Sequence, residues 1–346
     1  MKRADIAAQL LGPVVLVVGT AALGTAVSLS TETYFITALI NVTIVVALYL
    51  FIGNSGVLSF GHISFVALGV WTAGVLAVPG DAKPAIMPHL AHFLRATTVG
   101  NVPSLALAAA VGGVYAFAVG LPLMRLSGLT AGIATFAVLE ITHNVLRYTE
   151  QIGPGLNAFS SVPQTTGLLQ ASVAASIAVL AAFVYQRTRF GRMLRATRDD
   201  VAAARAVGIS VYRQRLLAFT LSGAGAGLAG GLYVHLLPLN AEDLYLDLTF
   251  ITLAMLVIGG ATSLLGAVVG ALAVTGIDSF FANAENGIRI VGISLNLPAG
   301  TRLVVVGAFM AVVLIARPSG LTGGRELRFP RAGWRRTAPR SDKVQL

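Results

Sequence analysis

The chain has 346 residues, of which 56% are hydrophobic and only 11% are charged. Soluble domains carry about 25% charged residues, so this composition excludes a soluble domain and indicates an integral membrane protein. The net charge is +10, but the basic residues gather in a central loop and a C-terminal tail without interleaved aromatic residues, which argues against nucleic-acid binding. The chain has no Cys, which excludes disulfides, thiolate metal sites and thiol catalysis.

Apolar runs of roughly 20 residues predict an all-α, polytopic bundle of transmembrane helices. We expect one membrane domain over residues 1–316 and a basic, partly disordered tail over 317–346. In chain order, the expected spans are about 10–29, 33–52, 57–78, 102–124, 129–147, 168–186, 216–236, 248–258, 264–281 and 301–316. The run 248–258 is short for a hydrocarbon core of about 30 Å, so the prediction is 8 to 10 spans with some segments re-entrant.

The charge distribution predicts which connections face the cytoplasm, because Lys and Arg near the ends of spans resist translocation. With the N-terminus inside, the inner connections are 53–56, 125–128, 187–215, 259–263 and the tail, so both termini are expected in the cytoplasm. The acidic residues of the outer connections agree with this topology; they are Glu32, Asp81, Glu150, Glu242, Asp243 and Glu285.

Glycine-rich breaks divide two of the long apolar runs at similar sequences, 52–61 and 258–266. The similarity suggests an internal repeat. Broken helices at matching places often line a transport path, because only there can unpaired backbone groups find water or substrate. The glycines that mark the breaks are Gly53, Gly56, Gly61, Gly259, Gly260 and Gly266.

Polar residues within the spans are candidates for a translocation path, because buried polar and ionisable groups are costly in a membrane. Near the first break, they are Asn54, Ser55, Ser59 and His62. The alternative for this segment is a seam of small residues that packs helices together.

Glu140 and His143 share a helical face at i and i+3, so they could pair. A Glu/His pair is also typical of a proton relay or of half a metal site. A di-metal bundle needs a second such motif, and none occurs, so we expect a structural or path-lining role and no metal.

The central loop 187–215 carries eight arginines and two aspartates. Within it, the stretch 200–207 is rich in Ala, the best helix former, with Asp199 and Asp200 before it and Gly208 after it as cap signals. This pattern predicts a short helix suited to docking in a groove of a soluble partner. The alternative is a solvated basic linker.

Several segments, taken in order, resemble the M-type permease subunits of bacterial branched-chain amino acid ABC importers. They are 53–69, 120–128, 134–136 with Glu140, 189–192, 208–209, 217–219, 227–233, 258–260 with Gly266, and 317–321. The resemblance covers about residues 37–320. It implies a multi-pass protein of the bacterial cytoplasmic membrane. The implied partners are a second permease, two cytoplasmic ATPase subunits and an extracytoplasmic solute-binding protein. ATP and Mg would be bound by the ATPases, and this chain would hold no cofactor.

By the same resemblance, the central loop is a coupling loop that sits in a cleft of the ATPase. Its matching positions give the candidate contacts Arg195, Arg198, Asp199, Asp200, Ala203, Ala204, Arg205 and Gly208. Val201 occupies a position where the family usually has Glu, so Asp199 or Asp200 would have to take over any contact of that acid. Asn54 and Ser55 occupy positions where small apolar residues are common in the family. This departure leaves urea, short amides and other small solutes open as substrates.

Three other functions remain as alternatives. An ion- or proton-coupled secondary transporter could use Glu140 and His143, and a structural subunit could leave the path to its sister permease. A membrane-embedded enzyme is disfavoured, because the sequence has no phosphate-binding loop, nucleophile elbow, paired metal-binding histidines or dinucleotide fingerprint.

Overall fold

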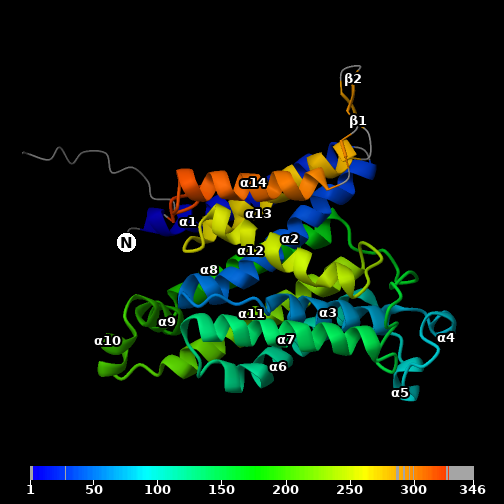
Figure 1. Ribbon diagram of the computed structural model, residues 1–346, viewed down its shortest axis with the longest axis horizontal. Helices are drawn as coiled ribbons and strands as arrows, with labels where there is room; N and C mark the ends of the chain where they lie inside the picture. The colour runs from blue at the N-terminus through cyan, green and yellow to red at the C-terminus, as the bar shows by residue number, and fades with distance from the viewer. Residues whose placement is uncertain are drawn as a thin grey trace, which may run out of the picture.

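A computed structural model describes residues 3–27, 29–285, 288–290, 293–295, 297–298, 300–324 and 326, and in these residues it is a bundle of roughly aligned long helices (Figure 1). The apolar helices are α1 (Arg3–Thr25), α2 (Leu29–Ser55), α3 (His62–Ala77), α6 (Asn101–Leu123), α7 (Gly128–Tyr148), α8 (Leu168–Arg187), α11 (Val211–Val234), α12 (Leu246–Gly259), α13 (Leu264–Glu285) and α14 (Thr301–Ala316). The predicted all-α membrane bundle is therefore confirmed. Most of the expected tail 317–346 lies outside the described residues.

Short elements connect these helices at the two ends of the bundle (Figure 1). They are α4 (Lys83–Ile86), α5 (His92–Arg95), α9 (Arg189–Asp199), α10 (Val201–Ala206), the 3-10 turn η1 (Glu242–Leu244), and the strands β1 (Ile288–Ile290) and β2 (Ile293–Leu295). The two strands pair antiparallel in a small hairpin, which the sequence did not predict. We call the end with α9 and α10 the basic side; α4, α5 and the hairpin lie at the opposite side.

Six of the described helices are long and apolar enough to cross a membrane: α2 (from Thr31), α6, α7, α8, α11 and α13. The apolar part of α1 (Gln9–Thr25), α3 and α14 are shorter, and α12 has 14 residues. At 1.5 Å per residue, α12 is about 21 Å long, which is less than the hydrocarbon core. The expectation of complete spans mixed with shorter segments agrees with these lengths.

The centre of the bundle is α11, which packs against α6, α3 and α2. Its glycines allow backbones to touch: a Cβ added at Gly69 of α3 would lie 2.1 Å from the carbonyl oxygen of Gly227, and one at Gly230 would lie 2.1 Å from that of Val66. Small residues at helix crossings are typical of membrane bundles, where close packing drives association. Almost every side chain of α2 between Ile36 and Ile52 is buried, as expected of a helix that is apolar all round.

The two glycine-rich breaks meet on the basic side. A Cβ at Gly53 would lie 2.5 Å from the carbonyl oxygen of Ala261, so the end of α2 touches the loop between α12 and α13. Gly56 has φ +70 and Gly260 has φ +115, conformations that favour glycine. The two segments predicted to form a repeat are therefore neighbours in space.

Residues after α14 form hydrogen bonds with the backbone at the second break, between α12 and α13. The amides of Leu321 and Thr322 donate to the carbonyl oxygens of Ile258 (2.7 Å) and Gly259 (3.2 Å). Oε1 of Glu326 accepts a hydrogen bond from the Leu264 amide (2.7 Å) at the start of α13. Backbone groups freed by the break thus find partners more than sixty residues further along the chain.

Candidate functional site

The central loop folds into two consecutive helices, α9 and α10. Asp200 caps α10: its Oδ1 accepts from the amides of Ala202 (2.7 Å) and Ala203 (3.0 Å). Gly208 follows α10 with φ +80, the left-handed conformation that commonly ends a helix. The short helix and two of its cap signals are as predicted, whereas Asp199 is the last residue of α9.

The candidate coupling residues divide between the surface and the interior. Most of α10 and the residues after it are exposed, including Ala203, Arg205 and Gly208, but Ala204 is buried against the bundle. Val201, at the position of the missing acid, is partly buried. The surface open to a partner is therefore the Ala203 side of α10.

Two arginines of α9 face the bundle. Nη1 of Arg198 donates to the carbonyl oxygen of Gly53 (2.6 Å), and its aliphatic stem lies over Gly56. Arg195 donates to the carbonyl oxygen of Gln186 at the end of α8. Arg198 thus joins the loop directly to the broken end of α2.

The polar residues near the first break are buried in the core of the bundle. His62 bonds through Nδ1 to the Ser59 hydroxyl (2.8 Å) and through Nε2 to the Ser222 hydroxyl (2.8 Å). Three phenylalanine rings surround the imidazole of His62. Their centroids lie 5.6 Å (Phe51), 5.6 Å (Phe65) and 5.4 Å (Phe219) from its centroid. These contacts hold α3 against α11. A path-lining role for His62 stays a prediction.

Asn54 and Ser55 end α2 in a similar environment. The Asn54 Nδ2 donates to the carbonyl oxygen of Leu50 (3.0 Å), and Ser55 Oγ accepts from the Val57 amide (3.2 Å). The other break glycines are also at close contacts: Gly61 lies against the Thr135 carbonyl and Gly266 against the Gly260 carbonyl. The structure shows tight packing here, and a role in transport is untested.

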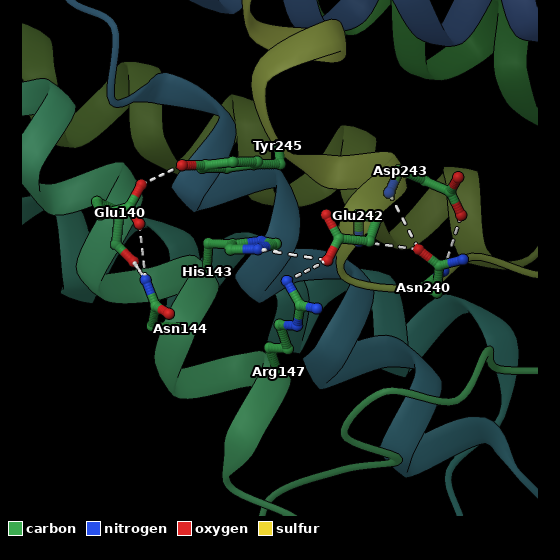
Figure 2. A network of polar contacts seen from close by, with 8 residues as sticks. All are labelled: Glu140, His143, Asn144, Arg147, Asn240, Glu242, Asp243 and Tyr245. Atoms are coloured by element: carbon green, nitrogen blue, oxygen red, sulfur yellow. Dashed lines mark hydrogen bonds and ion pairs between the residues drawn. The ribbon is translucent and has the colours of Figure 1, made fainter.

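A second polar cluster joins α7 to the turn before α12 (Figure 2). The Tyr245 hydroxyl donates to Oε2 of Glu140, and Asn144 Nδ2 donates to its Oε1 (2.9 Å). The His143 ring stacks on the Tyr245 ring with centroids 4.0 Å apart. Glu140 and His143, which share a face of α7 as predicted, are therefore linked through Tyr245.

An ion pair continues this cluster towards the opposite side. Arg147 Nη1 lies 2.5 Å from Oε1 of Glu242, and His143 Nε2 lies 3.8 Å from the same oxygen (Figure 2). The turn is held in shape by Asn240, whose Oδ1 accepts from the amides of Glu242 (2.8 Å) and Asp243 (3.1 Å). The result is a polar cap over one end of α7.

The Glu140 end of the cluster lies within the length of α7 and not at the end of the helix. Glu140 is eight residues before the last residue of α7, which is about 12 Å along the axis, and it accepts a hydrogen bond from Tyr245, the residue just before the short helix α12. Glu140 is partly buried and borders an exposed stripe of α7 that includes Ile133, Ile141, Asn144 and Tyr148. A carboxylate on such a face indicates contact with water or another protein rather than lipid tails.

The partners of Glu140 and His143 in this cluster were not predicted from the sequence. Glu242 was expected only as an outer acidic residue, and Arg147, Asn144 and Tyr245 were not singled out. Spacing could have suggested both helix partners, because Asn144 follows Glu140 by four residues and Arg147 follows His143 by four residues. Nothing in the sequence pairs Tyr245 with Glu140, 105 positions away.

Comparison with known proteins identifies the family. The family model for the permease component of branched-chain amino acid transport systems matches residues 30–314. The chain belongs to this family. The matched stretch contains the central loop, both breaks and the cluster on α7.

Curated relatives agree with this assignment. The chain is 26% identical over 305 residues to the high-affinity branched-chain amino acid transport system permease protein LivM of Salmonella typhimurium and of Escherichia coli K12. It is 30% identical over 224 residues to the autoinducer 2 import system permease protein LsrC of Enterobacter sp. strain 638, across 62% of this chain and 61% of that protein. The resemblance inferred from the sequence is confirmed at the level of the family.

Coverage of the relatives is partial. The match to LivM spans 78% of this chain and 64% of the relative. No solved structure matches the chain significantly.

Proposed function

We propose that this protein is a membrane-spanning permease subunit of an ATP-driven importer. With a sister permease it forms the path for branched-chain amino acids or a similar small polar solute delivered by a binding protein. Two ATPase subunits on the basic side, which is the cytoplasmic side, bind ATP and Mg and perform the hydrolysis. The family match over residues 30–314 carries this proposal, and the similarity to LsrC, an import system permease protein, supports an importer.

The contacts of α9 suggest how the ATPase moves the permease. A partner that displaces α10 also displaces α9, because Asp200 joins the two helices. Arg198 carries that displacement to Gly53, and Gly53 touches the loop of the second break at Ala261. The proposed coupling route therefore runs from the exposed surface of α10 to both broken helices.

A carboxylate within a span would suit an ion-coupled carrier, the alternative function. Against this, an ion-coupled carrier has no need of a capped, exposed helix tied to a broken span, and the relatives named above are permease proteins of transport or import systems. An importer accounts for the capped, exposed helix α10 and for the similarity to these relatives.

The test uses the assembled complex in proteoliposomes with Ala203→Asp. Because Ala203 is exposed, we expect normal assembly but loss of most solute-stimulated ATP hydrolysis, since a charge would enter the partner's groove. Arg213→Gln, which also lowers the charge by one unit but lies in α11, outside α9 and α10, is the comparison for charge alone. Ala204→Asp should instead reduce the yield of folded protein, because Ala204 is buried. Full stimulation by Ala203→Asp would contradict the docking role, and uptake by this chain without ATPases would favour the ion-coupled carrier.

A further inference from the structure

A groove of about 350 Å³ lies between α1, α2 and α13. α1 and α13 lie along the edge of the bundle away from α6 and α7, and so away from the polar cluster on α7 (Figure 1). Gly276 and Phe280 of its lining are exposed, so the groove is open at the surface of the bundle. Its volume is in the usual range of ligand sites, about 300–1,000 Å³.

The groove follows α13 through about half of the membrane. α13 has 22 residues, or about 33 Å, which is enough to cross a hydrocarbon core of about 30 Å. The lining extends from Leu272 near the middle of α13 to Asn283 in its last turn, a length of about 16 Å. The groove therefore spans the leaflet opposite the basic side, from its polar boundary to about the middle of the bilayer.

Polar groups on the lining gather near the boundary of the membrane. The Tyr34 hydroxyl of α2 donates to Oδ1 of Asn283 (2.6 Å), and the Asn283 Nδ2 donates to the carbonyl oxygen of Ser279 (3.0 Å). The Ser279 hydroxyl has no hydrogen bond to the residues that the structure describes. This end of the groove therefore offers a hydroxyl donor to a ligand.

Other hydroxyls on the lining are already paired within the protein. Thr20 Oγ1 donates to the carbonyl oxygen of Leu16 (2.8 Å), and Thr275 Oγ1 accepts from Asn41 Nδ2 (3.0 Å). The inner end of the groove, at Leu272, thus presents mainly apolar surface. The lining changes from polar to apolar towards the middle of the bilayer, in the same order as the parts of a lipid.

A negative charge stands at the mouth of the groove. Glu32 lies in the first turn of α2, next to Thr31 of the lining, and has no ion pair among the residues that the structure describes. Asp278 of α13 lies 3.3 Å from Arg302 Nε, which compensates its charge. The mouth therefore favours a ligand whose polar end is cationic.

The shape of the groove decides between a lipid chain and a helix of another protein. A volume of 350 Å³ over a length of about 16 Å gives a mean cross-section of about 22 Å². An α-helix is about 10 Å wide, so the groove is too narrow to receive one, whereas a single extended hydrocarbon chain fits.

We propose that the groove between α1, α2 and α13 binds a phospholipid with an ethanolamine head group from the leaflet opposite the basic side. One acyl chain lies along Phe35, Leu272 and Phe280. The ester oxygens accept a hydrogen bond from the Ser279 hydroxyl, and the ammonium group pairs with Glu32. This site is separate from the coupling route and does not depend on which solute the permease carries.

The first test fills the groove. Native mass spectrometry measures the binding of palmitoyl-oleoyl phosphatidylethanolamine to the purified complex after its lipids have been removed. Gly276→Leu should bind this lipid about tenfold more weakly, because the leucine side chain takes the place of the acyl chain. A Cβ at Gly276 meets no atom within 4 Å, and the same holds for Gly307 of α14, so Gly307→Leu is the matched control. Equal binding by the two variants would overturn the proposal.

Assembly of the same variants shows whether a protein covers the groove instead. A bound lipid predicts that Gly276→Leu retains its partner subunits as well as Gly307→Leu does. Loss of a partner subunit from Gly276→Leu alone would assign the groove to that subunit and contradict the proposal. Should Gly276→Leu fail to fold, Ser279→Leu fills the groove from the next turn of α13, with the same expected loss of lipid.

The second test concerns the head group. The unaltered complex should bind the ethanolamine lipid about 3- to 10-fold more tightly than palmitoyl-oleoyl phosphatidylglycerol, whose head group is anionic. Glu32→Gln should abolish most of this preference. Asp81→Asn, which removes a charge from another exposed residue on the same side, should preserve it. Equal binding of the two lipids by the unaltered complex would overturn the assignment of an ethanolamine lipid to this groove.

Discussion

The loop α9–α10 and the turn Asn240–Tyr245 lie at the two ends of α11, and they are constructed in different ways. In the loop, α9 packs on α2, α8 and α11, whereas α10 is shaped by local contacts, such as the cap by Asp200 only two and three residues away. The turn depends on partners about 100 residues distant, through Glu140–Tyr245 and Arg147–Glu242. A segment with local contacts keeps its shape while it is pushed as a unit, whereas a segment held by distant contacts can be released when those contacts are exchanged.

The hydrogen bond between Arg198 and Gly53 ties α9 of the loop to a distant part of the chain, because it spans 145 positions. Arg198→Ala should therefore produce the largest effect at this end. A hydrogen bond from a charged group contributes about 1.5–3 kcal/mol, so we expect uptake per ATP hydrolysed to fall about 10- to 100-fold in proteoliposomes. Arg192→Ala, at an exposed position of α9, is the control. Unchanged coupling in Arg198→Ala would show that α9 does not act through Gly53.

Removing the local cap should have a smaller effect. Loss of an N-cap costs about 1 kcal/mol, so Asp200→Ala should loosen α10 and lower solute-stimulated ATP hydrolysis about fivefold. Asp199→Ala is the comparison, because it removes the same charge from an exposed residue whose contact among the described residues is an ion pair with Arg198 Nε (3.6 Å) and not a cap. Equal losses in the two variants would mean that charge, rather than the cap, matters at this position.

The smallest expected effect concerns pH at the end that carries the turn. His235, just after α11, bonds to Ser104 (2.9 Å) and to the carbonyl oxygen of Pro163 (3.0 Å), and burial lowers its pKa below the ordinary value. In the unfolded chain His235 takes up a proton near pH 6.5, whereas in the folded protein it does so only at a lower pH. The contribution of His235 to stability is therefore present above about pH 6.5 and declines as the pH falls further.

Melting temperatures of the purified complex at pH 7.5 and pH 5.5 test whether acidification removes the contribution of His235 to stability. The decline on acidification should be smaller in His235→Gln than in the unaltered protein, because the variant has no group to titrate at this position. An identical decline in both would show that His235 does not contribute.

The features that the sequence predicted well are those encoded by neighbouring residues. The last helix, Thr301–Ala316, begins and ends where its apolar run does, and Asp200 and Gly208 flank α10 as their types indicate. The features that were missed depend on which helices become neighbours. No local pattern shows that Tyr245 approaches Glu140, that Arg198 reaches Gly53, or that the two breaks touch.

The contacts of Leu321, Thr322 and Glu326 with the break after α12 have a consequence for biogenesis. During synthesis, α12 and α13 leave the ribosome before the residues that satisfy the backbone between them, because those residues follow later in the chain. Until residue 326 has left the ribosome, the freed amides and carbonyl groups there lack their native partners, which is costly near a membrane. Nascent chains that stop short of this point would present an incomplete helix pair, and such chains are the ones that membrane quality-control proteases could recognise.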